Sequence, residues 1–147
     1  MKRLLLVFAM ILLVACGPAN ETPVASQNGI EISDVSIRLL DGSMPAAGYL
    51  TIKNTGSIND RLIGVTCDAA QQLMLHQSSV DANGVASMKM VVVIDVPAGQ
   101  QVNLEQGGYH IMLAALHDDF KAGSIVTLTL QFEQAGAVSV PVQVTKQ

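Results

Sequence analysis

The sequence predicts an all-β domain, an antiparallel β-sandwich with Greek-key connections between its strands. Apolar and polar residues alternate over short segments, which is the pattern of strands that bury one face. Gly, Asn, Asp and Pro interrupt these segments at intervals of roughly ten residues, and no segment shows the longer period of an amphipathic helix. The chain of 147 residues fits one domain, and its content of 50% hydrophobic and 14% charged residues is that of a folded protein.

The expected strands follow one another between residues 30 and 144. We expect them at 30–37, 49–53, 62–66, 73–77, 85–93, 102–104, 109–113, 125–132 and 138–144. Turn-forming residues separate these segments, among them Asn54 to Gly56, Asp81 to Gly84 and Pro97 to Gly99. The alternating pattern weakens over residues 114–121, where we expect a short helical turn.

A positively charged and then apolar segment precedes the domain. Lys2 and Arg3 lead into an apolar run over 4–14, whose 11 residues are too few to span a bilayer of about 30 Å. Small residues end the run immediately before Cys16, an arrangement that resembles the lipobox of a bacterial lipoprotein. The alternative is an ordinary secretory signal in which the cysteine is incidental.

The lipobox implies a chain of three parts. We expect a signal peptide at 1–15, a flexible tether over 16–28 that begins with the lipid-modified cysteine, and the folded domain over 29–147. The lipid anchors the mature chain on the periplasmic side of a bacterial membrane. Gly17, rather than an aspartate, follows the cysteine, which favours the outer membrane.

Composition argues against several classes of function. The chain has 3% aromatic residues and 8 Lys+Arg, so it lacks the stacking surface and the basic footprint of a nucleic-acid-binding protein. Removal of the signal peptide leaves 6 Lys+Arg against 12 Asp+Glu, so charge does not attract the chain to anionic lipids. The common phosphate-binding, dinucleotide-binding and serine-hydrolase motifs are absent from the sequence.

Methionine and histidine recur in pairs that are separated by one residue. The pairs are Met74 with His76, Met88 with Met90, and His110 with Met112. Residues two apart on a strand point to the same face, so each pair presents two donors together. Thioethers are soft neutral ligands that suit Cu(I), and imidazole suits copper or zinc, whereas Mg²⁺ and Ca²⁺ need oxygen ligands. Methionines in such positions can also serve as core filler.

Several blocks of sequence resemble the periplasmic copper chaperone family called PCu(A)C. These blocks are 47–54, 60–62, His76, 84–85, 88–90, 96–99, 107–113, 128–132 and 135–136. The most specific is the Gly-Gly-Tyr-His-Ile-Met-Leu block at 107–113, which stands downstream of a histidine and a Met-x-Met motif. The resemblance extends over residues 30 to 144.

The resemblance implies a cupredoxin-like β-sandwich that binds one Cu(I) ion at a solvent-accessible site. It implies a metallochaperone, and not an enzyme, that delivers copper to acceptors such as the CuA site of cytochrome c oxidase or a thiol copper chaperone. We expect a monomer. His76, His110 and Met112 match the family ligands. For the fourth ligand two residues stay open, since the local Met-x-Met match favours Met90 and the distance to His110 favours Met88.

Three other classes of function compete with this interpretation. An electron-transfer cupredoxin needs a cysteine thiolate beside its histidines, and Cys67 stands far from the 107–113 block. A structural or interaction β-sandwich lipoprotein would bind no metal at all. A hydrolase could use His117 with Asp118 and Asp119, but no nucleophile accompanies them.

Replacing Cys16 with Ser is expected to release the chain from the membrane and to leave copper binding unchanged. Thiol acylation requires the sulfur atom, whereas the first expected ligand stands sixty residues later in the sequence. Membrane fractionation followed by Cu(I) titration of the released chain measures both effects. Loss of copper binding in Cys16→Ser would mean that the cysteine is a ligand and that the lipobox interpretation is wrong.

Overall fold

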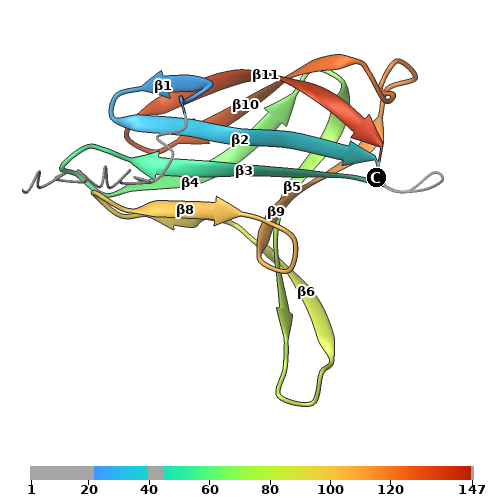
Figure 1. The fold of residues 1–147 in the computed structure, drawn as a ribbon, viewed down its shortest axis with the longest axis horizontal. Coiled ribbons are helices and arrows are strands. Elements are labelled where there is room, and N and C mark those ends of the chain that lie inside the picture. Colours follow the sequence, from blue (N-terminus) through green and yellow to red (C-terminus); the bar gives the residue numbers. More distant parts are fainter. Residues whose placement is uncertain (1–21, 40–44, 147) are drawn as a thin grey trace, which may run out of the picture.

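The computed structural model describes residues 22–39 and 45–146, and the predicted all-β class is confirmed there (Figure 1). The strands are β1 (Ala25–Gln27), β2 (Ile30–Leu39), β3 (Ala46–Asn54), β4 (Asp60–Cys67), β5 (Ala70–Val80), β6 (Ala86–Val91), β7 (Ile94–Val96), β8 (Gln101–Leu104), β9 (Tyr109–Leu116), β10 (Ile125–Phe132) and β11 (Gly136–Lys146). Cys16 and the expected signal peptide lie outside the described residues. Within them, no helix is long and apolar enough to cross a membrane.

The strands form one hydrogen-bonded path that folds back on itself. The path runs β6-β5-β9-β8-β3-β2-β11-β10-β4-β7, and β1 is added to β2. Because β4 and β5 also meet at the turn that joins them, two distant parts of the path come together around a core. Most neighbouring strands are antiparallel, as predicted. β11 and β2, from the two ends of the domain, pair in parallel, as do β8 and β9 through one residue pair.

The core is made by the inward-facing residues of alternating strands. In β10 and β11 every second residue is buried while its neighbours are mostly exposed. These inward residues are Val126, Leu128, Leu130 and Phe132 from β10, and Val138, Val140, Val142 and Val144 from β11. Burial of such a side chain contributes about 1.5–3 kcal/mol before the loss of conformational entropy is subtracted, so this pair of strands stabilises the body of the sandwich.

The β5–β6 hairpin projects away from this body (Figure 1). Its turn is organised by Asp81, whose Oδ1 accepts hydrogen bonds from the backbone N–H groups of Asn83 (2.8 Å) and Val85 (2.9 Å). Gly84 has a φ of 80°, which residues with a side chain rarely adopt. Residues 86–90 of β6 are all exposed. The hairpin is therefore held by its turn and its strand pairing, with little help from the core.

Three segments differ from the sequence-based expectation. The expected strand 85–93 ends at Val91, and a separate short strand, β7, follows at Ile94–Val96. Ala25–Gln27, within the expected tether, form β1 and pair with β2 through a two-residue turn at Asn28 (φ 48°) and Gly29 (φ 84°). The Asn-Gly turn favours such a hairpin, although the polar strand gives no alternating signal. Residues 114–116 continue β9, because they pair with β5, and only turns follow over 117–123. The expected helical turn is therefore wrong.

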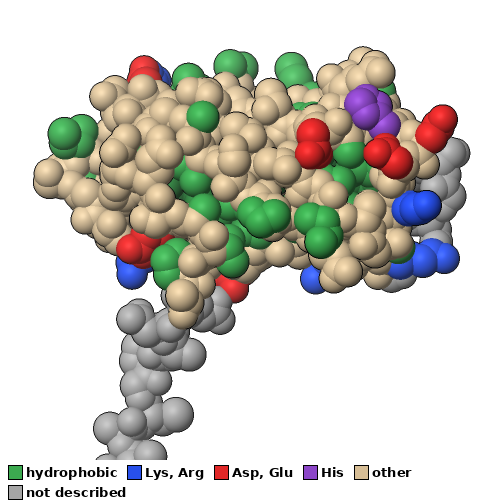
Figure 2. Space-filling model, turned by 90° about the horizontal axis from the view of Figure 1, so that it is seen from above, with side chains coloured by type: hydrophobic (Ala, Val, Ile, Leu, Met, Phe, Trp, Pro, Cys, Tyr) green, Lys and Arg blue, Asp and Glu red, His purple; other side chains and the backbone are tan. Residues whose placement is uncertain are grey.

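The surface is mixed in charge. On the face shown in Figure 2, acidic and basic side chains lie near each other toward both ends, and apolar side chains are dispersed among polar ones. The ion pair between Arg61 and Glu133 is of this kind, with Arg61 Nε 2.7 Å from Glu133 Oε2. Both side chains are partly exposed, and such surface pairs contribute little to folding.

Asp60 is a buried carboxylate that joins two backbone segments. Its Oδ1 accepts hydrogen bonds from the N–H groups of Arg61 (2.7 Å) and Gln134 (2.9 Å), and its Oδ2 accepts one from Ala135 (2.9 Å). These bonds attach the start of β4 to the turn between β10 and β11. Since the side chain is 4% exposed, no water replaces a lost bond easily.

Replacing Asp60 with Ala is expected to lower the free energy of unfolding by about 3 kcal/mol, because three N–H groups lose their acceptor in a largely buried place. Urea denaturation at neutral pH measures the change. Asp81→Ala is the matched control, since the same carboxylate is lost from an exposed turn, and about 1 kcal/mol is expected there. Equal losses in the two variants would contradict the structural role of Asp60.

Candidate metal centre

The pairing of three strands brings the methionines and histidines together. His76 in the centre of β5 lies opposite Met90 of β6 on one side and opposite His110 of β9 on the other. By the same registers, Met74 lies opposite Met112, and Met88 lies opposite Ser78, two residues after His76. Directly opposed residues of antiparallel strands share a face. All six residues of the predicted pairs therefore belong to one face of the β6-β5-β9 sheet.

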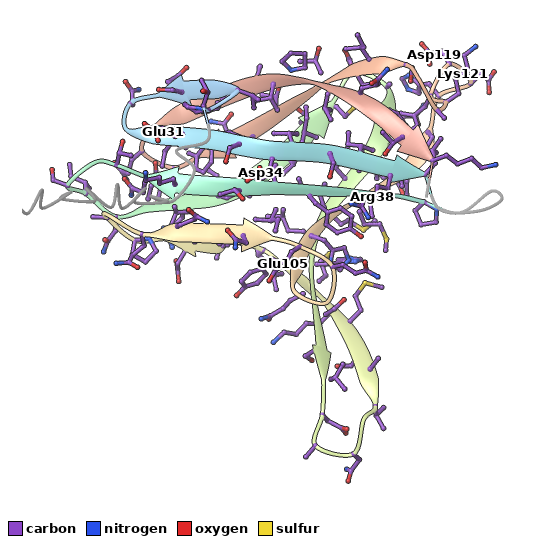
Figure 3. The ribbon with its side chains drawn as sticks, in the orientation of Figure 1. Glu31, Asp34, Arg38, Glu105, Asp119 and Lys121 are labelled. Carbon is purple, nitrogen blue, oxygen red and sulfur yellow. The ribbon has the colours of Figure 1, made fainter. Side chains whose placement is uncertain are left out.

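Met88, His110 and Met112 form the inner part of this group. The Nε2 atom of His110 lies 3.2 Å from the Sδ atom of Met88. Both residues and Met112 line a hollow of about 200 Å³, which Ala47 and Tyr49 of β3 also line. Sulfur atoms are visible near the base of the β5–β6 hairpin in Figure 3. Two thioethers and an imidazole thus meet in a small, mostly apolar space.

The turn before β9 orients the His110 ring. Its Nδ1 atom lies 3.1 Å from the carbonyl oxygen of Gly108, and because a carbonyl only accepts, Nδ1 carries the proton and donates it. In the neutral ring Nε2 is then the unprotonated nitrogen, and its lone pair is available to a metal ion. The turn itself is closed by a bond from Gly108 N–H to the Glu105 carbonyl and needs a φ of 86° at Gly107. Glu105 marks this loop in Figure 3.

His76 completes the group from the central strand. Its ring lies edge-on to that of His110, with the ring centroids 5.7 Å apart and the planes at 89°. Among the described residues its buried Nδ1 atom has no hydrogen-bond partner. Burial, and secondarily the neighbouring His110, lowers the pKa of His76 below its ordinary value. The ring is therefore neutral at pH 7, and its unpartnered nitrogen fits a position where a metal ion is bound.

The structure separates the two residues of the Met-x-Met motif. Met88 contacts His110, whereas Met90, although opposite His76, lines a second hollow of about 220 Å³ together with Met74. Met90 is 66% exposed and Met88 is 52% exposed. Of the two candidates for the fourth ligand, Met88 is thus the one that stands against an inner histidine.

The donor set of this face is chemically selective. Imidazole nitrogens and thioether sulfurs carry no negative charge, so they favour a monovalent soft ion over a hard divalent one. In the ranges that the structure describes, no three His, Cys, Asp or Glu side chains gather into a metal-binding cluster. The arrangement therefore suits Cu(I) better than Zn²⁺ or Ca²⁺.

The competing residues lie elsewhere. Cys67, at the end of β4, pairs with Leu128 and Ala70, and burial raises the pKa of its thiol. His117 is exposed in the turn after β9, where its N–H donates to the Ala69 carbonyl. Neither residue belongs to the strand register that collects the other donors.

Two contributors to the site were not singled out as functional from the sequence. The Gly108 carbonyl sets the orientation of His110, and Tyr49 of β3 lines the hollow. Both positions fall within the blocks of sequence that resemble the chaperone family. Their roles depend on backbone direction and on packing between β3 and β9, which a residue pattern does not display.

Comparison with known sequences places the chain in a lipoprotein family. The family described as "Putative lipoprotein LpqE-like" matches residues 30–144. A relative from Leifsonia xyli subsp. xyli, "Putative lipoprotein Lxx21020", is 35% identical over 130 residues, which cover 86% of this chain and 77% of the relative. The match to the family spans the whole of the sandwich from β2 onward.

Comparison with solved structures confirms the resemblance to PCu(A)C domains. The copper-bound PCuAC domain from PmoF2 superposes with a TM-score of 0.68 at 26% identity, over 83% of this chain and 97% of that domain. The solution structure of CuI-DR1885 from Deinococcus radiodurans gives a TM-score of 0.62 at 28% identity, over 88% of this chain and 83% of its own. The cupredoxin-like sandwich is therefore confirmed.

The pKa of His76 in the metal-free chain is expected to lie below its ordinary value of 6.5, because burial disfavours the charged ring. The folded chain then binds this proton less readily than the unfolded chain, so stability falls as the pH drops from the ordinary pKa through the lowered one. A pH titration followed by NMR of the histidine ring protons measures the pKa of His76. In His110→Gln the pKa should rise but stay below 6.5, since burial is the larger cause; a wild-type midpoint at or above 6.5 would contradict the prediction.

Proposed function

This chain belongs to the LpqE-like lipoprotein family, and on that premise we propose that it is a copper chaperone that carries one Cu(I) ion. The observation that carries the proposal is the placement of His110 Nε2 3.2 Å from Met88 Sδ, beside a second histidine with an unpartnered buried nitrogen. The likeness to copper-bound PCuAC domains supports it. A carrier that binds its ion and hands it on has no reaction to catalyse, so the role is non-enzymatic.

The proposed ligands are His76, Met88, His110 and Met112. His110 offers Nε2 because Gly108 holds its other nitrogen as a donor, and Met88 already contacts that atom. Met112 lines the same hollow, and His76 on β5 contacts the group through its ring, which lies edge-on to that of His110. The four neutral donors match the charge and softness of Cu(I), and the apolar walls limit competition by water.

Release of the ion requires an exposed ligand. His110 is 8% exposed and Met88 is 52% exposed, so a partner can approach the ion from the side of β6. A thiolate of the acceptor binds the ion as the Met88 sulfur leaves, and the remaining donors follow in turn. Copper stays in the +1 state throughout, so the exchange needs no electron. Acceptors with soft ligands, such as the CuA site of cytochrome c oxidase or a thiol copper chaperone, fit this step.

The chaperone is proposed to act while tethered to a membrane. A signal peptide over 1–15 and lipid on Cys16 agree with the membership of a lipoprotein family. The tether then extends to the first residues of the domain, where β1 begins at Ala25. The lipid confines the domain to the periplasmic side of a bacterial membrane, where membrane-bound acceptors stand within reach.

Single substitutions separate ligands from neighbours. His110→Ala and Met88→Leu are each expected to weaken Cu(I) binding by about 10- to 100-fold, because each variant removes one proposed donor atom. His117→Ala is the control and should bind one Cu(I) per chain with unchanged affinity. Competition with a colorimetric Cu(I) chelator under anaerobic conditions measures the constants.

The outcome can contradict the proposal in two ways. If His117→Ala weakens binding as much as His110→Ala, the site is assigned to the wrong histidine. If Met90→Leu weakens binding more than Met88→Leu, Met90 is the fourth ligand and the proposed inner set of ligands is wrong.

A further inference from the structure

We propose that Met74 and Met90, together with His76, form a second and outer Cu(I) position through which the ion passes on its way to an acceptor. This inference rests on the proposed function, because it presupposes that Cu(I) is bound at the inner site. It adds a distinct set of donors and a path of release.

The two methionines converge on one place outside the inner hollow. Met90 lies opposite His76, and Met74 precedes His76 by two residues on the same face of β5. Such diagonal neighbours on adjacent strands are about 7–8 Å apart, within reach of two long side chains that hold one ion between them. Both line the second hollow, whose other walls include Leu73, Val91 and Val92.

His76 is the link between the two positions. The strand register places it between Met90 and His110, so it borders both the outer and the inner donors. Its buried Nδ1 atom has no partner among the described residues, whereas the corresponding nitrogen of His110 is held by Gly108. The ring of His76 is thus free of the hydrogen bond that would fix it toward one side only.

Packing does not account for the outer methionines. A methionine that fills a core is buried, yet Met90 is 66% exposed and Met74 is only partly buried. Met90 stands on an edge strand next to Lys89, where a polar residue would be the ordinary choice. An exposed methionine whose register position is opposite a histidine with an unpartnered nitrogen is better explained as a soft ligand.

The proposed step is a ligand exchange that leaves every charge unchanged. The bond from the Met88 sulfur to the ion breaks while a bond from the Met90 sulfur forms, and His76 remains bound during the exchange. Met74 then replaces the inner donors. All of these ligands are neutral and copper remains Cu(I), so no proton or electron moves. At the outer position the ion lies along the exposed edge of β6, where an acceptor thiolate can take it.

The test is an anaerobic Cu(I) titration of the chain with isotope-labelled methionine methyl groups, followed by NMR. One equivalent is expected to shift the methyl signals of Met88 and Met112 in the wild-type chain. In Met88→Leu, where the inner position lacks one donor, the same equivalent is expected to shift the signals of Met74 and Met90. In the double variant Met74→Leu, Met90→Leu, affinity for the first ion should stay within about two-fold, while transfer to a dithiol chelator should slow by about ten-fold.

Val92→Ala is the matched control, since it changes the wall of the same hollow without removing a sulfur atom. It should transfer copper at the wild-type rate, and equal slowing in this variant would overturn the proposal. If one equivalent shifts Met88 and Met112 in the wild-type chain but leaves Met74 and Met90 unmoved in Met88→Leu, and the double variant transfers at the wild-type rate, the outer position is refuted and the chaperone function stands. If the wild-type chain binds no Cu(I), both proposals fail.

Discussion

The register of β5 between β6 and β9 is the constraint on which the candidate site depends. His76 lies opposite both Met90 and His110 only because the β5–β6 and β5–β9 hydrogen-bonded pairings (ladders) both include that residue. A slip of one residue in either ladder would turn the donors of that strand to the opposite face. Two local devices hold the register, the Asp81 turn between β5 and β6 and the glycine turn before β9.

The residues that stabilise the fold and the proposed copper ligands occupy different parts of the molecule. The apolar core lies between the strands of the body, and the buried carboxylate of Asp60 joins β4 to the β10–β11 turn there. The donors lie on the hairpin side, where β6 is almost wholly exposed. Because the two sets of residues hardly overlap, the ligands can be soft, flexible and accessible without weakening the fold that carries them.

An exposed edge strand with two methionines is also a hazard, since its free backbone groups can pair with another chain. Lys89 lies between Met88 and Met90 and turns to the opposite face, where a charge opposes self-association. The hairpin therefore combines accessibility for an acceptor with a residue that discourages unselective pairing. This combination is what a carrier needs if it is to bind its ion and give it up again.

The sequence by itself determined most of the strands, their alternation and the presence of soft donors in pairs. Those features depend on residues close along the chain, and a spacing of two residues implies a shared face wherever the strand goes. Only the tertiary structure decided that Met88 rather than Met90 stands against His110, that the polar Ala25–Gln27 segment is a strand, and that residues 114–116 continue β9. Each of these three features depends on which strand lies beside the segment. The neighbouring strand can come from a distant part of the sequence, and it pairs through backbone hydrogen bonds, which residue types do not specify.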